Sequence, residues 1–112
     1  DEKNREFQLG GIEEGQSFMT NSLNNFGYTK LTAAKDNMLC KKGESINAHE
    51  FHYSKSTNNG NSFIASKSDR SWECIIADDN KFMGYPHLHF WGNVNFAVNF
   101  IDKCIEYGEL CL

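Results

Sequence analysis

This sequence has little proline, no excess of positive charge and no long apolar run. Its 112 residues include one proline, Pro86, and 11 Lys and Arg against 15 Asp and Glu, a formal net charge of −4. Because nucleic-acid binding needs clustered positive charge, we expect no nucleic-acid partner. No apolar run approaches the roughly 20 residues that cross a bilayer, so we expect no membrane partner. Hydrophobic residues at 39% and nine phenylalanines exclude a disordered tail and predict one small globular unit.

Paired cysteine motifs are missing too. The four cysteines, Cys40, Cys74, Cys104 and Cys111, are even in number and would permit two disulfides. However, Cys74 lies in an apolar run and Cys104 on the apolar side of a predicted helix, so we expect both to be buried free thiols. No C-x-x-C pair is present, and we predict no metal site built on thiolates. Free cysteines are typical of a reducing compartment, so we expect the protein in the cytoplasm.

Short segments rich in strand formers occupy the middle of the chain. We predict strands over residues 28–33, 38–40, 45–54, 62–66, 72–77 and 81–90, separated by polar turns. In residues 45–54 the alternation places Ile46, Ala48 and Glu50 on one face and Asn47 and His49 on the other.

One helix is predicted after Asn93, whose side chain can cap it. Gly108 is expected to end the helix. Phe96 and Phe100 share an offset face, which we expect to meet a partner or a missing half of the domain. The main apolar stripe follows helical spacing and consists of Val94, Ala97, Val98, Ile101, Cys104 and Ile105.

Five or six strands and one helix define the expected fold, a strand-rich α+β fragment of the α/β class. A sheet of this size has two faces to cover, and one helix covers only part of one. The chain is therefore predicted to be part of a larger domain.

All four histidines fall in two clusters, His49 with His52 and His87 with His89. Residues two apart on a strand share a face, so the second pair admits three interpretations. The histidines can be structural, they can chelate a metal with His49 or His52 as third ligand, or one can act as a general base. Spacing alone leaves these alternatives open.

Three segments carry a resemblance to a known family. They read F-M and F-G-Y at residues 18–19 and 26–28, A-H-E-F-H-Y-S at residues 48–54, and Y-P-H-L-H-F at residues 85–90. In this order they resemble the C-terminal part of the glutaminase domain of the cobyrinic acid a,c-diamide synthases, where the longer motifs usually read G-H-E-F-H-Y-S and Y-x-H-L-H-F. The resemblance spans roughly residues 10–106.

The resemblance implies the C-terminal half of a flavodoxin-like class I glutamine amidotransferase domain, with residues 1–112 lacking the half that carries the nucleophile elbow. It implies an ATP-dependent ligase of cobalamin biosynthesis that uses glutamine to amidate the a and c carboxylates of cobyrinate. An N-terminal synthetase domain would be the partner and would hold ATP and Mg²⁺, so no cofactor is expected in this stretch. A homodimer is left open. A related variant of the family amidates a nickel-containing sirohydrochlorin, and these motifs do not separate the two substrates.

By motif position, His87 corresponds to the catalytic histidine that activates a cysteine thiol. His89 fills the slot where ordinary class I glutaminases carry an orienting Glu, which leaves Glu50 as a candidate orienting group and His49 and His89 as secondary site residues. No cysteine here has the small neighbours of a nucleophile elbow, so we expect the chain alone to be inactive as a glutaminase. Two alternatives remain, a metal-binding β-rich module using His87 and His89, and a non-catalytic interaction domain.

Overall fold

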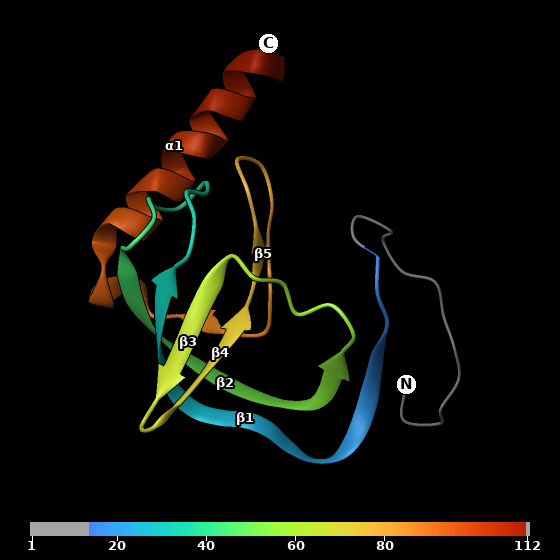
Figure 1. Ribbon diagram of the computed structural model, residues 1–112. Coiled ribbons are helices and arrows are strands. Elements are labelled where there is room, and N and C mark those ends of the chain that lie inside the picture. The colour runs from blue at the N-terminus through green and yellow to red at the C-terminus, as the bar shows by residue number, and fades with distance from the viewer. Residues whose placement is uncertain (1–13, 112) are drawn as a thin grey trace.

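The described part of the chain is built mainly from a five-stranded antiparallel sheet and one C-terminal helix (Figure 1). The computed structural model describes residues 14–111, without the side chains of residues 20–26, 51–55 and 111. The sheet order is β4-β3-β1-β2-β7, and β5 and β6 form a separate two-stranded sheet. The strands are β1 (Ser17–Ala33), β2 (Ser45–Ser56), β3 (Phe63–Lys67), β4 (Arg70–Cys74), β5 (Ile76–Ala77), β6 (Phe82–Met83) and β7 (His87–Leu88).

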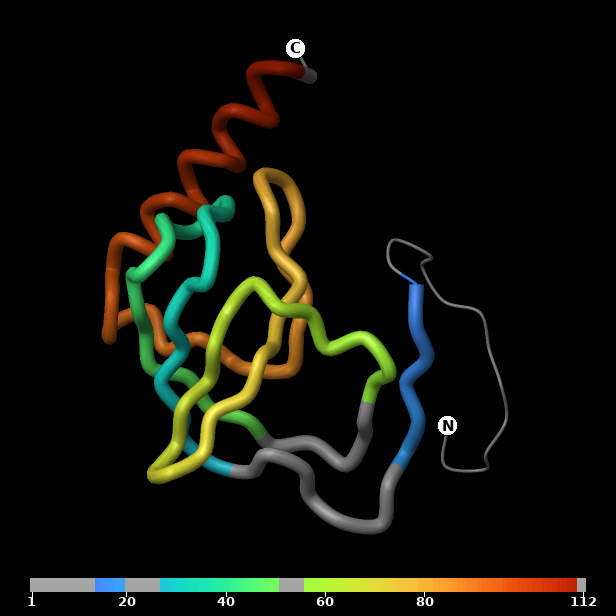
Figure 2. Tube along the Cα trace, viewed as in Figure 1, coloured from blue at the N-terminus to red at the C-terminus, as the bar shows by residue number. Residues whose placement is uncertain are grey.

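The predicted strand-rich α+β fragment with one helix is confirmed. Every strand pair in residues 14–111 is antiparallel, so the described residues do not include the parallel strands of a flavodoxin-like sheet. The position of the chain within such a domain stays a prediction. Residues 18–19 and 26–28 of the first motif belong to β1, which pairs antiparallel with β2. The Cα trace in Figure 2 shows the C-terminal helix extending away from the strands.

Residues 38–40 do not form the strand that was predicted. The Asn37 side chain accepts a hydrogen bond from the Leu39 N–H at 2.9 Å, and the Asn37 N–H donates to the Cys40 carbonyl at 2.9 Å. This local bonding replaces a strand ladder, because Asn competes well for nearby backbone groups. Leu39 and Cys40 nevertheless join the core from this loop.

The strand predicted over residues 72–77 is broken at Ile75, which has φ +68°. This left-handed conformation is unfavourable for a β-branched residue, and burial of the whole Ile75 side chain holds it in place. Across the break, the buried Ser62 hydroxyl accepts from the Ala77 N–H at 2.9 Å and donates to the Ala77 carbonyl at 3.1 Å. The Ser62 side chain therefore substitutes for a backbone partner at the point where β4 gives way to β5.

The segment 81–90 is also interrupted, contrary to the single strand predicted. It contains β6, a bend at residues 84–86, and β7, followed by a 3₁₀ turn over Phe90–Gly92. Pro86 has no N–H to donate and lies immediately before β7, which limits the length of a regular ladder there.

Helix α1 (Val94–Cys111) begins where predicted but ends later than Gly108. Asn93 caps it, because its side-chain oxygen accepts from the Asn95 N–H at 3.3 Å while its amide donates to the Ser45 carbonyl at 3.0 Å. Farther along, the Asn99 amide donates to the Leu39 carbonyl at 2.6 Å. The first half of the helix is thus tied to the loop before β2, and the second half projects away from the sheet (Figure 1).

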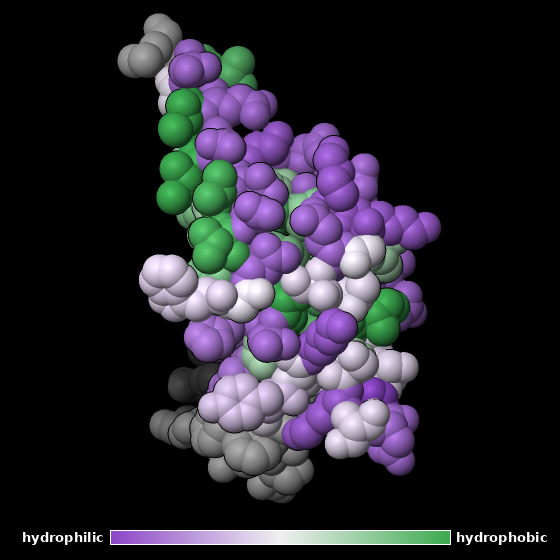
Figure 3. All heavy atoms as spheres, turned by 90° about the vertical axis from the view of Figure 1, so that its left-hand side faces the viewer, coloured by the Kyte–Doolittle hydropathy of each residue, from purple (hydrophilic) through white to green (hydrophobic). Residues whose placement is uncertain are grey.

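The face of α1 that packs is not the one predicted. Phe96 is fully buried and its ring lies 6.4 Å from that of Phe63, so it belongs to this chain's own core. Cys104 is exposed, contrary to the expected burial. The predicted stripe forms an exposed apolar band along the helix, and Figure 3 shows it from the side. Its large exposed members are Val94, Val98, Ile101 and Ile105, and Phe100 is exposed beside them.

Candidate functional site

The two histidine-containing segments, far apart in the sequence, lie side by side in the sheet. Strand β2 pairs with β7 so that His49 lies opposite His87 and Ala48 opposite Leu88. The pairing continues past the end of β7, where the His89 N–H donates to the Asn47 carbonyl at 2.9 Å. The fold therefore brings the two longer motifs of the family resemblance, at residues 48–54 and 85–90, together in one corner of the sheet.

A row of three side chains crosses this corner on its outer face. Tyr28 of β1 lies opposite His49 of β2, which lies opposite His87 of β7. Residues directly opposite in antiparallel strands share a face. The Tyr28 side chain is 80% exposed and His87 is exposed as well, whereas His49 between them is half-buried. The rings of Tyr28 and His49 meet edge to face, with centroids 5.1 Å apart and an interplanar angle of 62°.

Glu50 lies on the opposite, inner face of the same strand. It is only 2% exposed, and it lies opposite Gly27 of β1. Because successive side chains of a strand alternate between faces, Glu50 points away from the face that carries His87. Glu50 therefore does not share a face with His87, and its role as the orienting group stays a prediction. Desolvation, reinforced by the Glu50 charge, raises the pKa of the Cys74 thiol to about 12.

Two hollows lie among the described residues, and neither includes His87 in its lining. One has a volume of about 250 Å³ on the inner side, and its lining includes Glu50, Cys74, Tyr85 and Pro86. It lies beneath the bend that leads into β7.

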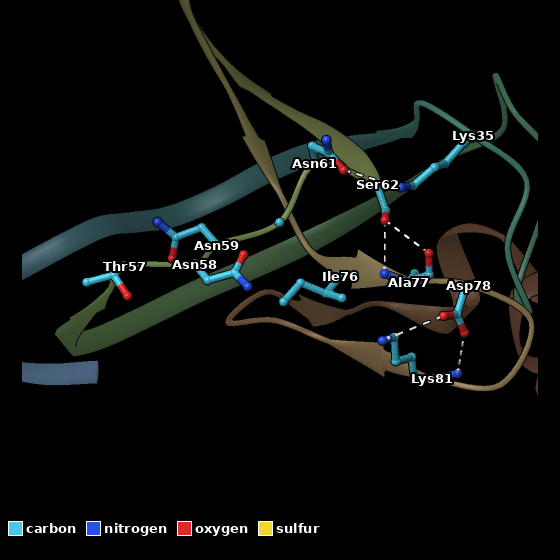
Figure 4. Close-up of a pocket in the computed structure, with 11 residues that line it drawn as sticks. Lys35, Thr57, Asn58, Asn59, Asn61, Ser62, Ile76, Ala77, Asp78 and Lys81 are labelled. Atoms are coloured by element: carbon cyan, nitrogen blue, oxygen red, sulfur yellow. Dashed lines mark hydrogen bonds and ion pairs between the residues drawn. The ribbon is translucent and has the colours of Figure 1, made fainter. Parts of the chain in front are cut away.

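The second hollow has a volume of about 510 Å³ and is more polar (Figure 4). It lies between the loop over residues 57–61 and the β5–β6 hairpin. In it Lys35 donates to the Asn61 side-chain oxygen at 3.3 Å, and the Lys81 ammonium lies 3.7 Å from the Asp78 carboxylate. A hydrogen bond from the Asn80 N–H lowers the pKa of Asp78. Sequence reasoning missed this hollow, although the N-N-G-N run at residues 58–61 marks its loop.

A metal centre is not favoured by this arrangement. Within residues 14–111, no three His, Cys, Asp or Glu side chains among those described come together as a group able to hold an ion. His89 lies one residue beyond the end of β7, although its N–H continues the pairing with Asn47. The side chain of His52, the other proposed third ligand, lies outside the described residues.

The described cysteines are free and do not occupy a nucleophile position. Cys40 and Cys74 are buried, and burial raises the pKa of Cys40 to about 11. Cys40 lies in a loop between strands, Cys74 ends β4 and Cys104 lies within α1, so none lies at a turn from strand to helix. Buried thiols with a raised pKa are poor nucleophiles. Cys111 has no described side chain.

No described helix combines the length and the apolar character needed to cross a bilayer.

Comparisons with curated proteins show the class of protein related to this chain. Twenty-seven curated proteins match the chain. The names of eight of these relatives denote synthases that form amides. These eight carry the name cobyrinate a,c-diamide synthase, and the resemblance predicted from the motifs is confirmed. No family model and no solved structure matches the chain.

Three of these relatives illustrate the extent of the match. The enzyme from Caldanaerobacter subterraneus is 30% identical over 92% of the chain and 24% of its own length. The Clostridium acetobutylicum protein is 34% identical over 81% of the chain and 22% of its own length. The Clostridium tetani protein is 37% identical over 83% of the chain and 23% of its own length. The chain thus spans about a quarter of the length of the curated relatives it matches.

Proposed function

We propose that the chain is the histidine-bearing part of a glutamine-hydrolysing amidotransferase that amidates the a and c carboxylates of cobyrinate. The similarity of nearly the whole chain to cobyrinate a,c-diamide synthases carries this proposal. The exposed position of His87 at the edge of the sheet supports it, because a catalytic base must be open to its substrate.

His87 is assigned the role of base toward a cysteine thiol supplied from outside residues 1–112. One ring nitrogen of His87 takes the thiol proton, and the thiolate attacks the side-chain amide carbon of glutamine. The amide nitrogen leaves as ammonia, carrying the proton that His87 returns to it. Water then hydrolyses the thioester to glutamate and regenerates the thiol. The ammonia is the nucleophile that forms each new amide on cobyrinate.

Activation of the carboxylates is not assigned to this chain. ATP and Mg²⁺ would supply that chemistry in the synthetase domain, where a carboxylate would be activated as an acyl phosphate, and phosphate would leave when ammonia attacks the acyl carbon. Among the described residues no group of three suitable side chains is available for a magnesium ion. The sequence of residues 1–112 also contains no glycine-rich motif of the kind that binds phosphate.

A chimera tests the proposal. This chain replaces the matching quarter of the Clostridium tetani relative, and amide formation on cobyrinate is measured with glutamine or with ammonium as nitrogen donor. We expect His87→Asn to abolish the glutamine-dependent reaction, by 10²-fold or more, and to leave the ammonium-dependent reaction within about twofold. Retention of the ammonium-dependent reaction shows that the chimera is folded.

Two results would overturn the assignment. One is a His87→Asn chimera that still uses glutamine as well as the parent chimera does. The other is release of ammonia when the 112-residue chain alone is incubated with glutamine, because the chain would then carry its own nucleophile.

A further inference from the structure

His87 needs a group that holds its ring, and the structure offers a partner other than a carboxylate. A histidine base works best when one ring nitrogen is fixed by a hydrogen bond, because that bond selects the tautomer and aims the other nitrogen. Among the described residues no carboxylate forms an ion pair with His87, and Glu50 faces the other side of the sheet.

The neighbour that does share its face is His49. The register places it directly opposite His87, and such pairs have Cβ atoms about 4.5–5.5 Å apart. Two imidazole rings rooted at this separation reach each other without any movement of the backbone. A neutral imidazole offers one N–H donor and one nitrogen acceptor, so His49 can accept a hydrogen bond from the His87 ring.

His49 is itself held in place from the other side. The edge-to-face contact with Tyr28 restrains its ring plane, because aromatic rings favour this arrangement over others at the same separation. Tyr28 is 80% exposed, so burial in the core does not explain an aromatic residue at this position. In this row, Tyr28 restrains the His49 ring, His49 offers a hydrogen-bond acceptor, and His87 lies at the sheet edge as the base.

We propose that His49 is the positioning residue of His87. It accepts a hydrogen bond from one N–H of the His87 ring, which selects a single neutral tautomer and leaves the other nitrogen of His87 free toward the thiol. When His87 takes the thiol proton, it keeps the N–H that it donates to His49, so His49 stays neutral throughout. The purpose of this arrangement rests on the proposed function, whereas the pairing of the two rings does not.

Nuclear magnetic resonance of the chain labelled with ¹⁵N-histidine tests the pairing without any enzymatic assay. Long-range ¹H–¹⁵N correlations give the ratio of the two neutral tautomers of each ring. We expect one dominant tautomer for His87, and a rise of several-fold in the minor tautomer in His49→Phe, which keeps a ring against Tyr28 but removes the acceptor.

Matched variants isolate the cause. His49→Gln retains a side-chain acceptor and is expected to restore the parent ratio at His87. His89→Phe removes a neighbouring histidine that lies outside the row, and is expected to leave the ratio unchanged. Tyr28→Leu alters an exposed side chain, so the fold is preserved, and it should raise the minor tautomer to an intermediate level by loosening His49.

An unchanged ratio in both His49→Phe and Tyr28→Leu would overturn the proposal, as would an equal effect of His89→Phe. The chimera separates this failure from failure of the proposed function. If His87→Asn abolishes glutamine use but His49→Phe leaves the tautomer ratio of His87 unchanged, only the positioning role of His49 is refuted. If the ratio responds to His49 while His87→Asn leaves glutamine use intact, the pairing stands and the catalytic assignment falls.

Discussion

Replacement of Phe96 by alanine tests how α1 is attached to the sheet. Phe96 is the only fully buried side chain described in α1, and it packs against Phe63, whose ring also lies 5.7 Å from that of Phe82. Removing a buried phenyl ring costs about 3–5 kcal/mol through lost burial and the cavity left behind. Because whole domains are stable by only about 5–15 kcal/mol, we expect Phe96→Ala to lose a large part of the free energy of unfolding.

Urea denaturation followed by tryptophan fluorescence measures this loss, since Trp72 and Trp91 lie outside the substituted position. Phe100→Ala is the matched control, because the same ring at position 100 is 48% exposed on the same helix. We expect it to cost less than about 1 kcal/mol. Equal losses in the two variants would refute the packing described here and would restore the view that both rings face a partner.

Three further predictions concern the core and its thiols. Ser62→Ala should lower the unfolding free energy by about 1–3 kcal/mol, and hydrogen exchange at the Ala77 amide should accelerate, because the buried N–H loses its acceptor. Gly60→Ala should prevent folding to the same state, seen as loss of the parent amide spectrum, because at φ +79° its Cβ would run into the Ile75 carbonyl. With iodoacetamide at pH 8, mass spectrometry should find the exposed Cys104 modified and Cys74 untouched, and labelling of Cys74 first would contradict its burial.

Alkaline pH should destabilise the fold through the buried thiols. Burial raises the pKa of Cys74 from 9.0 to about 12, so the folded state holds this proton more tightly than the unfolded state does. The resulting stabilisation is complete below pH 9 and is lost as the pH rises from 9 toward 12. Urea midpoints measured across this range should fall less steeply for Cys74→Ala than for the parent, and parallel curves would contradict the assignment.

Local signals predicted much of this fold. The alternation of residues 45–54 correctly separates buried Ile46 and Ala48 from exposed Asn47, and Asn93 correctly marks the start of the helix. The break at Ile75 was beyond such reasoning, because its left-handed backbone depends on burial and on a distant serine hydroxyl. No propensity rule favours a β-branched residue there.

The helix and the site show a second limit. Helical periodicity identifies apolar faces, but the choice between them depends on what the sheet presents, and the sheet presents Phe63 to Phe96. The motifs indicated His49 and His87 separately. Their pairing required the register between β2 and β7, which lie 30 residues apart and which no local pattern specifies.

The period of two along β2 has a consequence for how this segment can change. A single inserted or deleted residue upstream of Ala48 would turn the strand over, sending the His49 imidazole into the interior and the Glu50 carboxylate out to solvent. Length changes in this strand should therefore be tolerated only in steps of two residues. The loop over residues 57–61 has no alternating faces, so its length is not restricted to such steps.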